Sequence, residues 1–345
     1  MSAAHGMLYV SNFLSEGRNQ GYCEQLAERL EGRGWEVTRT STLHNRARRL
    51  ADMLGTAWSA RRRYSVAAVD VFSGPAFLWA EATCFGLRRL NKPYVLTLHG
   101  GNLPRFAARW PRRVRRLLES ASIVTAPSRY LRDGMRLYRP DIVVLPNALD
   151  VPAFSFTHRS SARPALVWVR AFHEIYNPVL AIETLALLAP RFPAVRLTMI
   201  GADKGDGSLQ RVVERAQELG VTERLEITGR LPRSEVSKHL AASDILINTT
   251  NIDNTPLSIL EAAASGCCIV STSVGGIPFL LHDQRDALLV PPSDAAAMSA
   301  AVAHILTEPT LAGRLSRHAR ELAETCDWPP VLDQWETTLE RVRAR

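Results

Sequence analysis

The sequence predicts an α/β protein made of two doubly wound parallel-sheet domains. Its 345 residues are enough for two domains that each bury a core of their own. Apolar runs of strand length alternate with helix-length amphipathic segments along the chain, a pattern typical of parallel βαβ units. A polar stretch, HRSSARP, interrupts this pattern near the middle and is interpreted as a linker. We therefore place the first domain at residues 1–155 and the second at 156–326.

The first domain opens with a strand, a glycine-bearing loop and a helix. The strand is expected at 8–11, the loop continues to Gly21, and a helix at 22–31 leads to a second strand at 35–40. Such a loop lies at the ligand-binding edge of a doubly wound sheet. Gly17 and Gly21 are too far apart for the dinucleotide fingerprint, which argues against an NAD enzyme.

Further strands in this domain are expected at 66–71, 94–98 and 120–127, with helices at 50–60 and 77–90. His99, Gly100 and Gly101 directly follow the strand at 94–98. A histidine that ends a parallel strand lies at the carboxyl edge of the sheet, where this architecture places its chemistry. The alternative interpretation is an ordinary polar loop residue.

The second half repeats the alternation of strands and helices. Its strands are expected at 165–169, 196–200, 225–228, 244–248, 267–270 and 287–291, and its late helices at 294–306, 311–325 and 335–342. Arg170 follows the first of these strands. Gly229, Arg230 and Leu231 follow the third.

The stretch 243–278 contains a short helix between two strands. Thr255 is a good N-cap, Pro256 a good first helical residue and Gly266 a good helix stop. The backbone N–H groups of Leu257 and Ser258 then lie at the positive end of a helix dipole, which favours an anion such as phosphate.

Two carboxylates bracket this anion site. Glu261 stands in a helix of otherwise apolar residues, and Asp253 lies in the loop before the helix. A proline-started helix is common, and a lone glutamate on a short helix is more often solvated than functional. The combination of both acids with the Gly275-Gly276 turn after the next strand favours a site for a sugar, a diphosphate and a ribose.

Composition and charge exclude several classes. The chain is 46% hydrophobic and 22% charged, and no apolar run reaches the length of a membrane span. The N-terminus has no basic region followed by an apolar signal core. Five scattered cysteines support neither a disulfide framework nor a zinc site. We expect a cytoplasmic protein.

The positive charge is concentrated in the first half. Residues 1–150 hold 23 Lys and Arg against 12 Asp and Glu, a net charge of +11, whereas the rest holds 19 against 22. The segment from Arg105 to Arg116 places apolar residues at helical spacing among six arginines. This pattern suits an anionic membrane surface or acceptor, which would put the protein at the inner membrane face. A solvated helix face is an equal alternative, and nucleic acid is disfavoured because no binding motif accompanies the charge.

The segment Asp253-Asn-Thr-Pro-Leu-Ser-Ile-Leu-Glu261 resembles the Glu-x-seven-Glu signature of family 4 retaining glycosyltransferases, with Asp at the first position. The resemblance covers nearly the whole chain. It implies the GT-B fold, in which two Rossmann-like domains face each other across a cleft and a last helix, here 327–345, crosses back to the first domain. It also implies that Glu261 binds the donor ribose and that Asp253 contacts the sugar near its anomeric centre.

The same resemblance assigns further donor-site residues. Arg170 matches the arginine that binds the donor diphosphate, whereas Ile175 stands where the family has a second, lysine ligand. Lys204 is a candidate replacement. Residues that match the rest of the family's donor site are Gly21, His99, Gly229, Arg230, Leu231, Asn254, Thr255, Leu257 and Ser258. His99 is expected to approach the transferred sugar, and Gly229 to Leu231 the nucleobase.

The resemblance implies a retaining glycosyltransferase that uses a nucleotide-diphosphate-sugar and a sugar or lipid-linked acceptor of the cell envelope or an exopolysaccharide. No cofactor is expected. No metal is expected either, because no Asp-x-Asp motif accompanies the site and the helix terminus and Arg170 supply positive potential. Two alternatives stay open: an epimerase or hydrolase of nucleotide sugars with the same fold, and a non-enzymatic nucleotide-sugar-binding module at the membrane surface.

Overall fold

The computed structural model describes residues 5–14 and 21–344, and the chain divides into two compact units. The first unit is Met1–Ala148 together with Pro329–Arg345, and the second is Leu149–Trp328. The boundary lies earlier than the expected residue 155, because Val151 and Phe154 are buried in the core of the second unit. The glycine-bearing loop before Gly21 lies partly outside the described residues.

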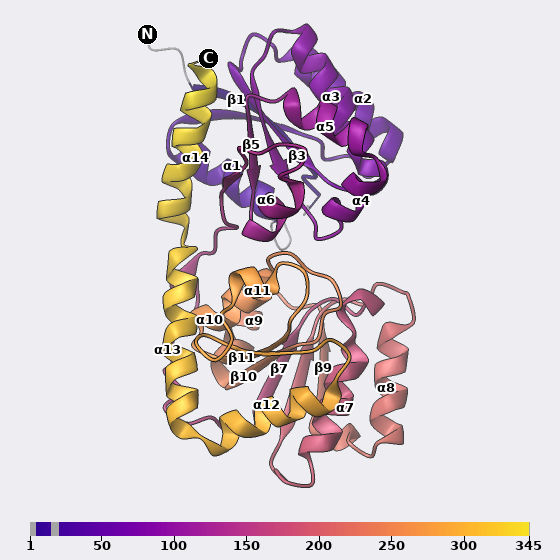
Figure 1. Ribbon diagram of the computed structural model, residues 1–345, viewed down its shortest axis with the longest axis vertical. Helices are drawn as coiled ribbons and strands as arrows, with labels where there is room; N and C mark the ends of the chain where they lie inside the picture. Colours follow the sequence, from indigo (N-terminus) through magenta and orange to yellow (C-terminus); the bar gives the residue numbers. More distant parts are fainter. Residues whose placement is uncertain (1–4, 15–20, 345) are drawn as a thin grey trace. The chain divides into compact units, whose positions relative to one another are not determined.

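The first unit contains a six-stranded parallel sheet (Figure 1). Its order is β2-β1-β3-β4-β5-β6. The strands are β1 (His5–Val10), β2 (Trp35–Thr40), β3 (Val66–Val71), β4 (Tyr94–Leu98), β5 (Ile123–Ala126) and β6 (Val143–Val144). The chain winds in opposite directions from β1 and β3. In an open parallel sheet this switch point marks the place where ligands bind, beyond the carboxyl ends of the strands.

The helices of the first unit cover both faces of this sheet. They are α1 (Tyr22–Gly32), α2 (Arg46–Ser59), α3 (Phe77–Arg89), α4 (Leu103–Arg109), α5 (Pro111–Glu119), α6 (Arg129–Met135) and α14 (Trp328–Arg343), with a 3₁₀ turn η1 (Gly74–Ala76). Helix α14 lies against α1 and β2: Trp335 donates a hydrogen bond to the Tyr22 hydroxyl (3.2 Å), and Arg33 pairs with Asp333 (3.0 Å) and Glu336 (2.9 Å).

The second unit also contains a six-stranded parallel sheet. Its order is β12-β11-β10-β7-β8-β9, so its switch point lies between β7 and β10. The strands are β7 (Ala165–Val169), β8 (Arg196–Ile200), β9 (Leu225–Gly229), β10 (Ile245–Asn248), β11 (Cys268–Thr272) and β12 (Leu288–Val290).

Two hydrophobic cores cover the two faces of this second sheet. Because neighbouring side chains of a strand point to opposite faces, Trp168 packs in one core and Val167 in the other. The helices are α7 (Pro178–Leu188), α8 (Ser208–Glu218), α9 (Arg233–Ala242), α10 (Leu257–Ala264), α11 (Ile277–Leu280), α12 (Ala295–Thr307) and α13 (Pro309–Thr325); the 3₁₀ turns are η2 (Val151–Ala153), η3 (Glu174–Tyr176) and η4 (Thr222–Arg224).

The segment HRSSARP is part of the second unit rather than a linker. Arg159, its second residue, is 3% exposed. Its guanidinium donates to the carbonyl oxygens of Ser265 (2.5 Å) and Ser243 (2.7 Å), and to three others, Thr157, Leu240 and Ala241. A buried arginine with this many acceptors fixes its segment in place. Arg159 alone of this segment is buried, and its hydrogen bonds attach the otherwise largely exposed polar segment to the second unit.

The last helix is longer than the sequence pattern predicts. It begins at Trp328 instead of residue 335 and includes Pro329 and Pro330 in its first turn. Proline is compatible with the first turn of a helix, where the N–H groups have no intrahelical acceptor. These prolines therefore start the helix and do not break the chain before it.

Candidate active site

The site of the second unit lies at the β7/β10 switch point. Arg170 follows β7, and the loop containing Asp253 follows β10. The Arg170 guanidinium forms an ion pair with the Asp253 carboxylate and lies 4.9 Å from the centre of the Tyr176 ring. Both charged side chains are 15% exposed, so their charges are partly shielded from water. The sequence-predicted phosphate ligand and the first acid of the Glu-x-seven-Glu-like motif are therefore direct neighbours.

Three glycines allow the loops around this pair to approach closely. A Cβ on Gly201, after β8, would lie 1.6 Å from the Arg170 carbonyl oxygen. A Cβ on Gly275 or Gly276 would lie 2.1 Å from the carbonyl oxygen of Asp253 or Asn254 respectively. Gly276 N–H donates to the Asp253 carbonyl (3.0 Å). Any side chain at these three positions would displace the backbone that holds Arg170 and Asp253.

Helix α10 begins one residue later than predicted. Its N-cap is Pro256, so Thr255 is not the cap. The Thr255 hydroxyl is buried and has no hydrogen-bond acceptor or donor among the described residues. The Asp253 carboxylate accepts a bond from the Asn254 N–H (2.8 Å). The first helical N–H groups belong to Leu257 and Ser258, as the sequence indicates.

Glu261 lies on α10, and its half-buried side chain lies beside two arginines. Arg233, the first residue of α9, places Nη2 3.4 Å from Glu261 Oε1 and its guanidinium 5.4 Å from the Phe154 ring centre. Burial raises the pKa of Glu261, and the charges of Arg233 and Arg170 partly offset that rise. Arg170 and Arg233 thus form the positive side of this site.

The two other predicted parts of the donor site follow β8 and β9. Lys204 is exposed, and its backbone N–H donates a hydrogen bond to the Phe172 carbonyl (3.2 Å). Gly229 has a φ of 72°, a conformation that favours glycine, and its carbonyl accepts the Gly201 N–H (2.9 Å). Arg230 is exposed and Leu231 half-buried. The loops after β7, β8 and β9 therefore adjoin one another at one edge of the sheet.

Arg233 is a site residue that the sequence analysis missed. Its segment, RSEVSKHL, has the composition of an exposed helix start, and its acidic partner lies 28 positions further on. One sequence signal could have identified it. Arg233 directly follows the strand-end motif GRLP, which lies at the same sheet edge as Arg170.

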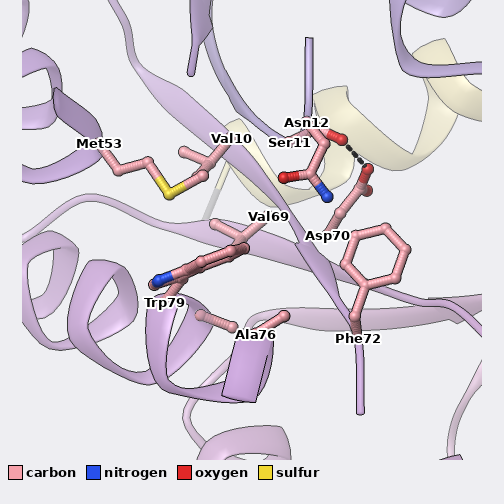
Figure 2. A pocket seen from close by; sticks show the side chains of 10 residues that line it. Val10, Ser11, Asn12, Met53, Val69, Asp70, Phe72, Ala76 and Trp79 are labelled. Carbon is pink, nitrogen blue, oxygen red and sulfur yellow. Dashed lines mark hydrogen bonds between the residues drawn. The ribbon is translucent and has the colours of Figure 1, made fainter. Parts of the chain in front are cut away.

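A second site lies at the β1/β3 switch point of the first unit. Figure 2 shows Ser11, at the end of β1, and Asp70, in β3, side by side, and the Ser11 hydroxyl donates to Asp70 Oδ2 (2.5 Å). His99, after β4, places Nε2 3.0 Å from Asp70 Oδ1. The His99 ring stacks on Phe72 with 5.0 Å between ring centres. The predicted sugar-side histidine therefore belongs to a buried polar cluster.

Gly21 forms the N-cap of α1. Its N–H donates to Glu24 Oε2 (2.5 Å), and its φ of −68° is open to any residue. A Cβ there would make ordinary contact at 3.4 Å with the Glu24 carboxylate. The backbone of this position does not require glycine, so a need for glycine would have to come from a bound ligand.

The arginine-rich segment forms two helices, α4 and α5, separated at Trp110. Its apolar residues Val114 and Leu117 are buried in the core of the first unit. Arg113 pairs with Glu81. The side chains of Arg112, Arg115 and Arg116 line an open surface pocket with Pro111, Glu119 and Ser120. The segment thus offers arginines to solvent, whereas most of its apolar face packs inside the protein.

No helix among the described residues is long and apolar enough to cross a membrane. In the same residues, no group of three or more His, Cys, Asp and Glu side chains is arranged to hold a metal ion.

Comparison with known proteins identifies the family. Two family models match the chain: Glycosyltransferase Family 4 over residues 20–152, and Glycosyl transferases group 1 over residues 163–308. Among curated relatives, D-inositol 3-phosphate glycosyltransferase of Saccharomonospora viridis is 30% identical over 220 residues (58% of this chain and 50% of the relative). Glycogen synthase of Mycobacterium tuberculosis is 27% identical over 220 residues (62% of this chain and 52% of the relative). The chain spans about half the length of these curated relatives.

Solved structures show the same fold. Sucrose-phosphate synthase from Thermosynechococcus elongatus has a TM-score of 0.83 at 18% identity and covers 99% of both chains. Anabaena HepE, solved with UDP and glucose, has a TM-score of 0.76 at 15% identity and covers 98% of this chain and 100% of its own. Two parallel-sheet α/β units with this likeness define a GT-B glycosyltransferase fold. The chain belongs to the group 1, or family 4, glycosyltransferases.

Proposed function

We propose that this protein is a hexosyltransferase that moves a sugar from a nucleotide-diphosphate-sugar to an acceptor hydroxyl with retention of anomeric configuration. One observation carries the proposal. An arginine and an acid, Arg170 and Asp253, pair at the β7/β10 switch point, where α10 begins and where its half-buried Glu261 lies near Arg170. This group supplies a cation for phosphate and carboxylates for ribose and sugar hydroxyls.

The donor would lie along the sheet edge of the second unit. Arg170 and the N–H groups of Leu257 and Ser258 suit the diphosphate, because a guanidinium and a helix start both favour phosphate oxygens. Glu261 would accept hydrogen bonds from the ribose. The remaining donor contacts assigned to the loops are Lys204, Gly229, Arg230, Leu231, Asn254 and Thr255. The buried Thr255 hydroxyl has an open hydrogen-bonding capacity there.

Donor binding would exchange one partner of Arg170 for another. In the free protein the guanidinium is paired with Asp253. A diphosphate carries more negative charge than a carboxylate and accepts the same two-pronged hydrogen bonds. Its arrival would therefore draw Arg170 toward phosphate and release the Asp253 carboxylate to the sugar hydroxyls near the anomeric carbon.

Transfer would depend mainly on charge stabilisation. As the bond between the anomeric carbon and the β-phosphate oxygen breaks, negative charge grows on that phosphate, and Arg170 and the start of α10 are positioned to offset it. The departing phosphate would take the proton of the acceptor hydroxyl as the new glycosidic bond forms. Arginine and helix dipole fill the role of a cation, so we expect activity in EDTA equal to activity without it.

A panel of nucleotide sugars tests the proposal. UDP-glucose is the first donor to try, because HepE was solved with UDP and glucose. Thermal-shift screening of UDP-, GDP- and ADP-sugars finds the donor, and nucleotide release with and without acceptor extracts then separates transfer from hydrolysis. NMR of the product gives its anomeric configuration. Nucleotide release that does not depend on acceptor, an epimerised donor, or tight binding without turnover would each replace transferase with one of the alternative functions.

A lipid-linked or membrane-bound acceptor is a second part of the proposal. Arg112, Arg115 and Arg116 line an open pocket on α5, in the half of the chain that carries the net positive charge. Anionic lipid headgroups are attracted to such clusters by about 1 kcal/mol per arginine near the surface. This part of the proposal gives the protein a peripheral position at the inner membrane face.

A further inference from the structure

Asp70 is a buried acid in the first unit that has no role in the proposed function described above. It is the only charged residue in β3, whose sequence is VAAVDV. Its side chain is 3% exposed. A carboxylate is costly to bury unless partners compensate its charge, so we expect polar partners around it.

Several polar groups surround this carboxylate. Ser11 donates to Oδ2 at 2.5 Å, and His99 Nε2 lies 3.0 Å from Oδ1. Burial raises the pKa of the Tyr9 phenol well above its usual value, and the negative charge of Asp70 adds to that rise. Burial, and then the charge of Asp70, also raise the pKa of the Cys23 thiol to about 12. The neighbouring Tyr9 and Cys23 thus stay neutral beside the Asp70 carboxyl group.

His99 is held on two sides. Phe72 stacks on its ring with 19° between the planes, and Asp70 faces its Nε2 edge. Its backbone is fixed by the bond from His99 N–H to the Val71 carbonyl (2.9 Å). Among the described residues, neither Asp70 Oδ1 nor His99 Nε2 has a partner that meets hydrogen-bond geometry, although both atoms are buried and lie 3.0 Å apart. The contact between the two atoms is therefore an electrostatic one.

We propose that Asp70 is a positioning residue that fixes the tautomer and orientation of His99. A neutral imidazole has one N–H, and a carboxylate opposite Nε2 holds the proton on that nitrogen. The lone pair then lies on Nδ1. His99 Nδ1 consequently accepts a hydrogen bond from a substrate hydroxyl. An acceptor at this position favours a sugar hydroxyl, which can donate, over a substrate group that can only accept hydrogen bonds. This inference rests on the proposed sugar-transfer function for its substrate, but the tautomer itself is a property of the free protein.

The tautomer is tested by NMR of protein labelled with ¹⁵N-histidine. Long-range ¹⁵N–¹H correlations at about pH 8.5, where ordinary histidines are neutral, distinguish protonated from unprotonated ring nitrogens. The His99 signals are assigned by their loss in His99→Gln. We expect Nε2–H and bare Nδ1 in the native protein, and altered ring shifts in Asp70→Asn. The control is Asp52→Asn, which changes a half-buried acid that accepts a bond from Thr40 (3.0 Å) in the same unit. A native Nδ1–H tautomer, or His99 shifts unchanged by Asp70→Asn, would overturn the inference.

A double-mutant cycle tests the effect on transfer. Asp70→Asn should lower kcat/KM by about 10- to 100-fold, the usual cost of losing an orienting partner, while keeping the melting temperature within a few degrees. In a His99→Ala background the same change should cost nothing further. Losses that multiply instead would show that Asp70 acts independently of His99 and would overturn the inference. If no donor is turned over, the proposed function fails, and the NMR measurement still decides the role of Asp70. If Asp70→Asn does not fold, the tautomer of the native protein decides it.

Discussion

Arg233 Nη2 lies 3.4 Å from Glu261 Oε1, so each acid of the candidate donor site has an arginine beside it in the free protein. Asp253 is paired with Arg170, and Glu261 lies against Arg233. The sequence has isoleucine at position 175, where family 4 resemblance leads us to expect a lysine. Arg233 brings a second cation to the site from another element, the start of α9.

Replacing Arg233 by alanine should weaken binding of the donor about tenfold, because a hydrogen bond to a charged group contributes roughly 1.5 kcal/mol or more. Isothermal titration with the donor or its nucleoside diphosphate measures this. Arg233→Lys should recover part of the affinity, since it restores the charge but not the planar fork. Lys204→Ala is the comparison variant, because Lys204 is the other candidate for the second cation. A larger loss in Lys204→Ala than in Arg233→Ala would identify Lys204 as the second cation instead.

Glu261→Gln should raise the donor Kd by about 10-fold or more, because an amide accepts hydrogen bonds from ribose hydroxyls less strongly than a carboxylate. The change keeps the size of the side chain. Titration with the nucleoside alone should show most of the loss, since the proposed contact is with the ribose. Unchanged affinity and turnover would remove Glu261 from the site.

The same substitution should stabilise the free protein near pH 7. Burial raises the pKa of Glu261, so the folded state binds the proton more tightly than the unfolded state does. The folding free energy therefore becomes less favourable as the pH rises from about 4.3, the ordinary value, through the raised folded-state value. Scanning calorimetry should show a higher melting temperature for Glu261→Gln at about pH 7, with a gap that closes toward about pH 4. A gap independent of pH would show that titration of Glu261 is not its source.

Arg170→Ala should lower kcat about 100- to 1,000-fold, the usual effect of removing one group that stabilises developing negative charge. The kcat of Arg170→Lys should lie between that of the native protein and that of Arg170→Ala. Steady-state assays with saturating donor separate this effect from weaker binding. Arg314→Lys, an exposed position on α13, serves as the control. A normal kcat in Arg170→Ala would mean that the leaving phosphate is stabilised elsewhere.

Binding to anionic vesicles should depend on Arg112, Arg115 and Arg116. Co-sedimentation with vesicles of phosphatidylglycerol and phosphatidylcholine at low salt should decrease when all three are changed to glutamine, and should also decrease as salt rises. A triple change of Arg61, Arg62 and Arg63 removes the same charge from another place and is the control. Equal loss in both variants would indicate nonspecific attraction, and no binding by the native protein would remove the membrane proposal.

Much of the fold can be predicted from the sequence because buried parallel strands have a recognisable local pattern of apolar residues. The strands at 35–40, 66–71, 94–98 and 196–200 have the predicted bounds. The strands at 66–71 and 94–98 are mostly apolar or β-branched runs, as is typical of buried parallel strands. Arg170 was recognisable because it directly follows the strand at 165–169, and Asp253 because it lies in the loop between the strand at 245–248 and the next helix.

The residues that the sequence analysis missed depend on partners far along the chain. Arg159 has the surroundings of a linker in the sequence, and only the fold brings carbonyls from 240–243 and 265 to its guanidinium. Arg233 and Glu261 are 28 positions apart. Asp70 did leave a signal, a single acid within a strand of valines and alanines, but its partners Ser11 and His99 come from two other strand ends.

Helix α14 belongs to the unit that the first 148 residues begin. At roughly 5–20 residues per second, a ribosome needs about 10–40 s to make the intervening segment 149–328 before this helix emerges. During that time the surface that will receive Trp335 and Leu339, both buried in the finished protein, stays uncovered. We therefore expect a period during synthesis of this protein in which part of the apolar surface of its first unit is uncovered, a condition that favours aggregation and chaperone binding.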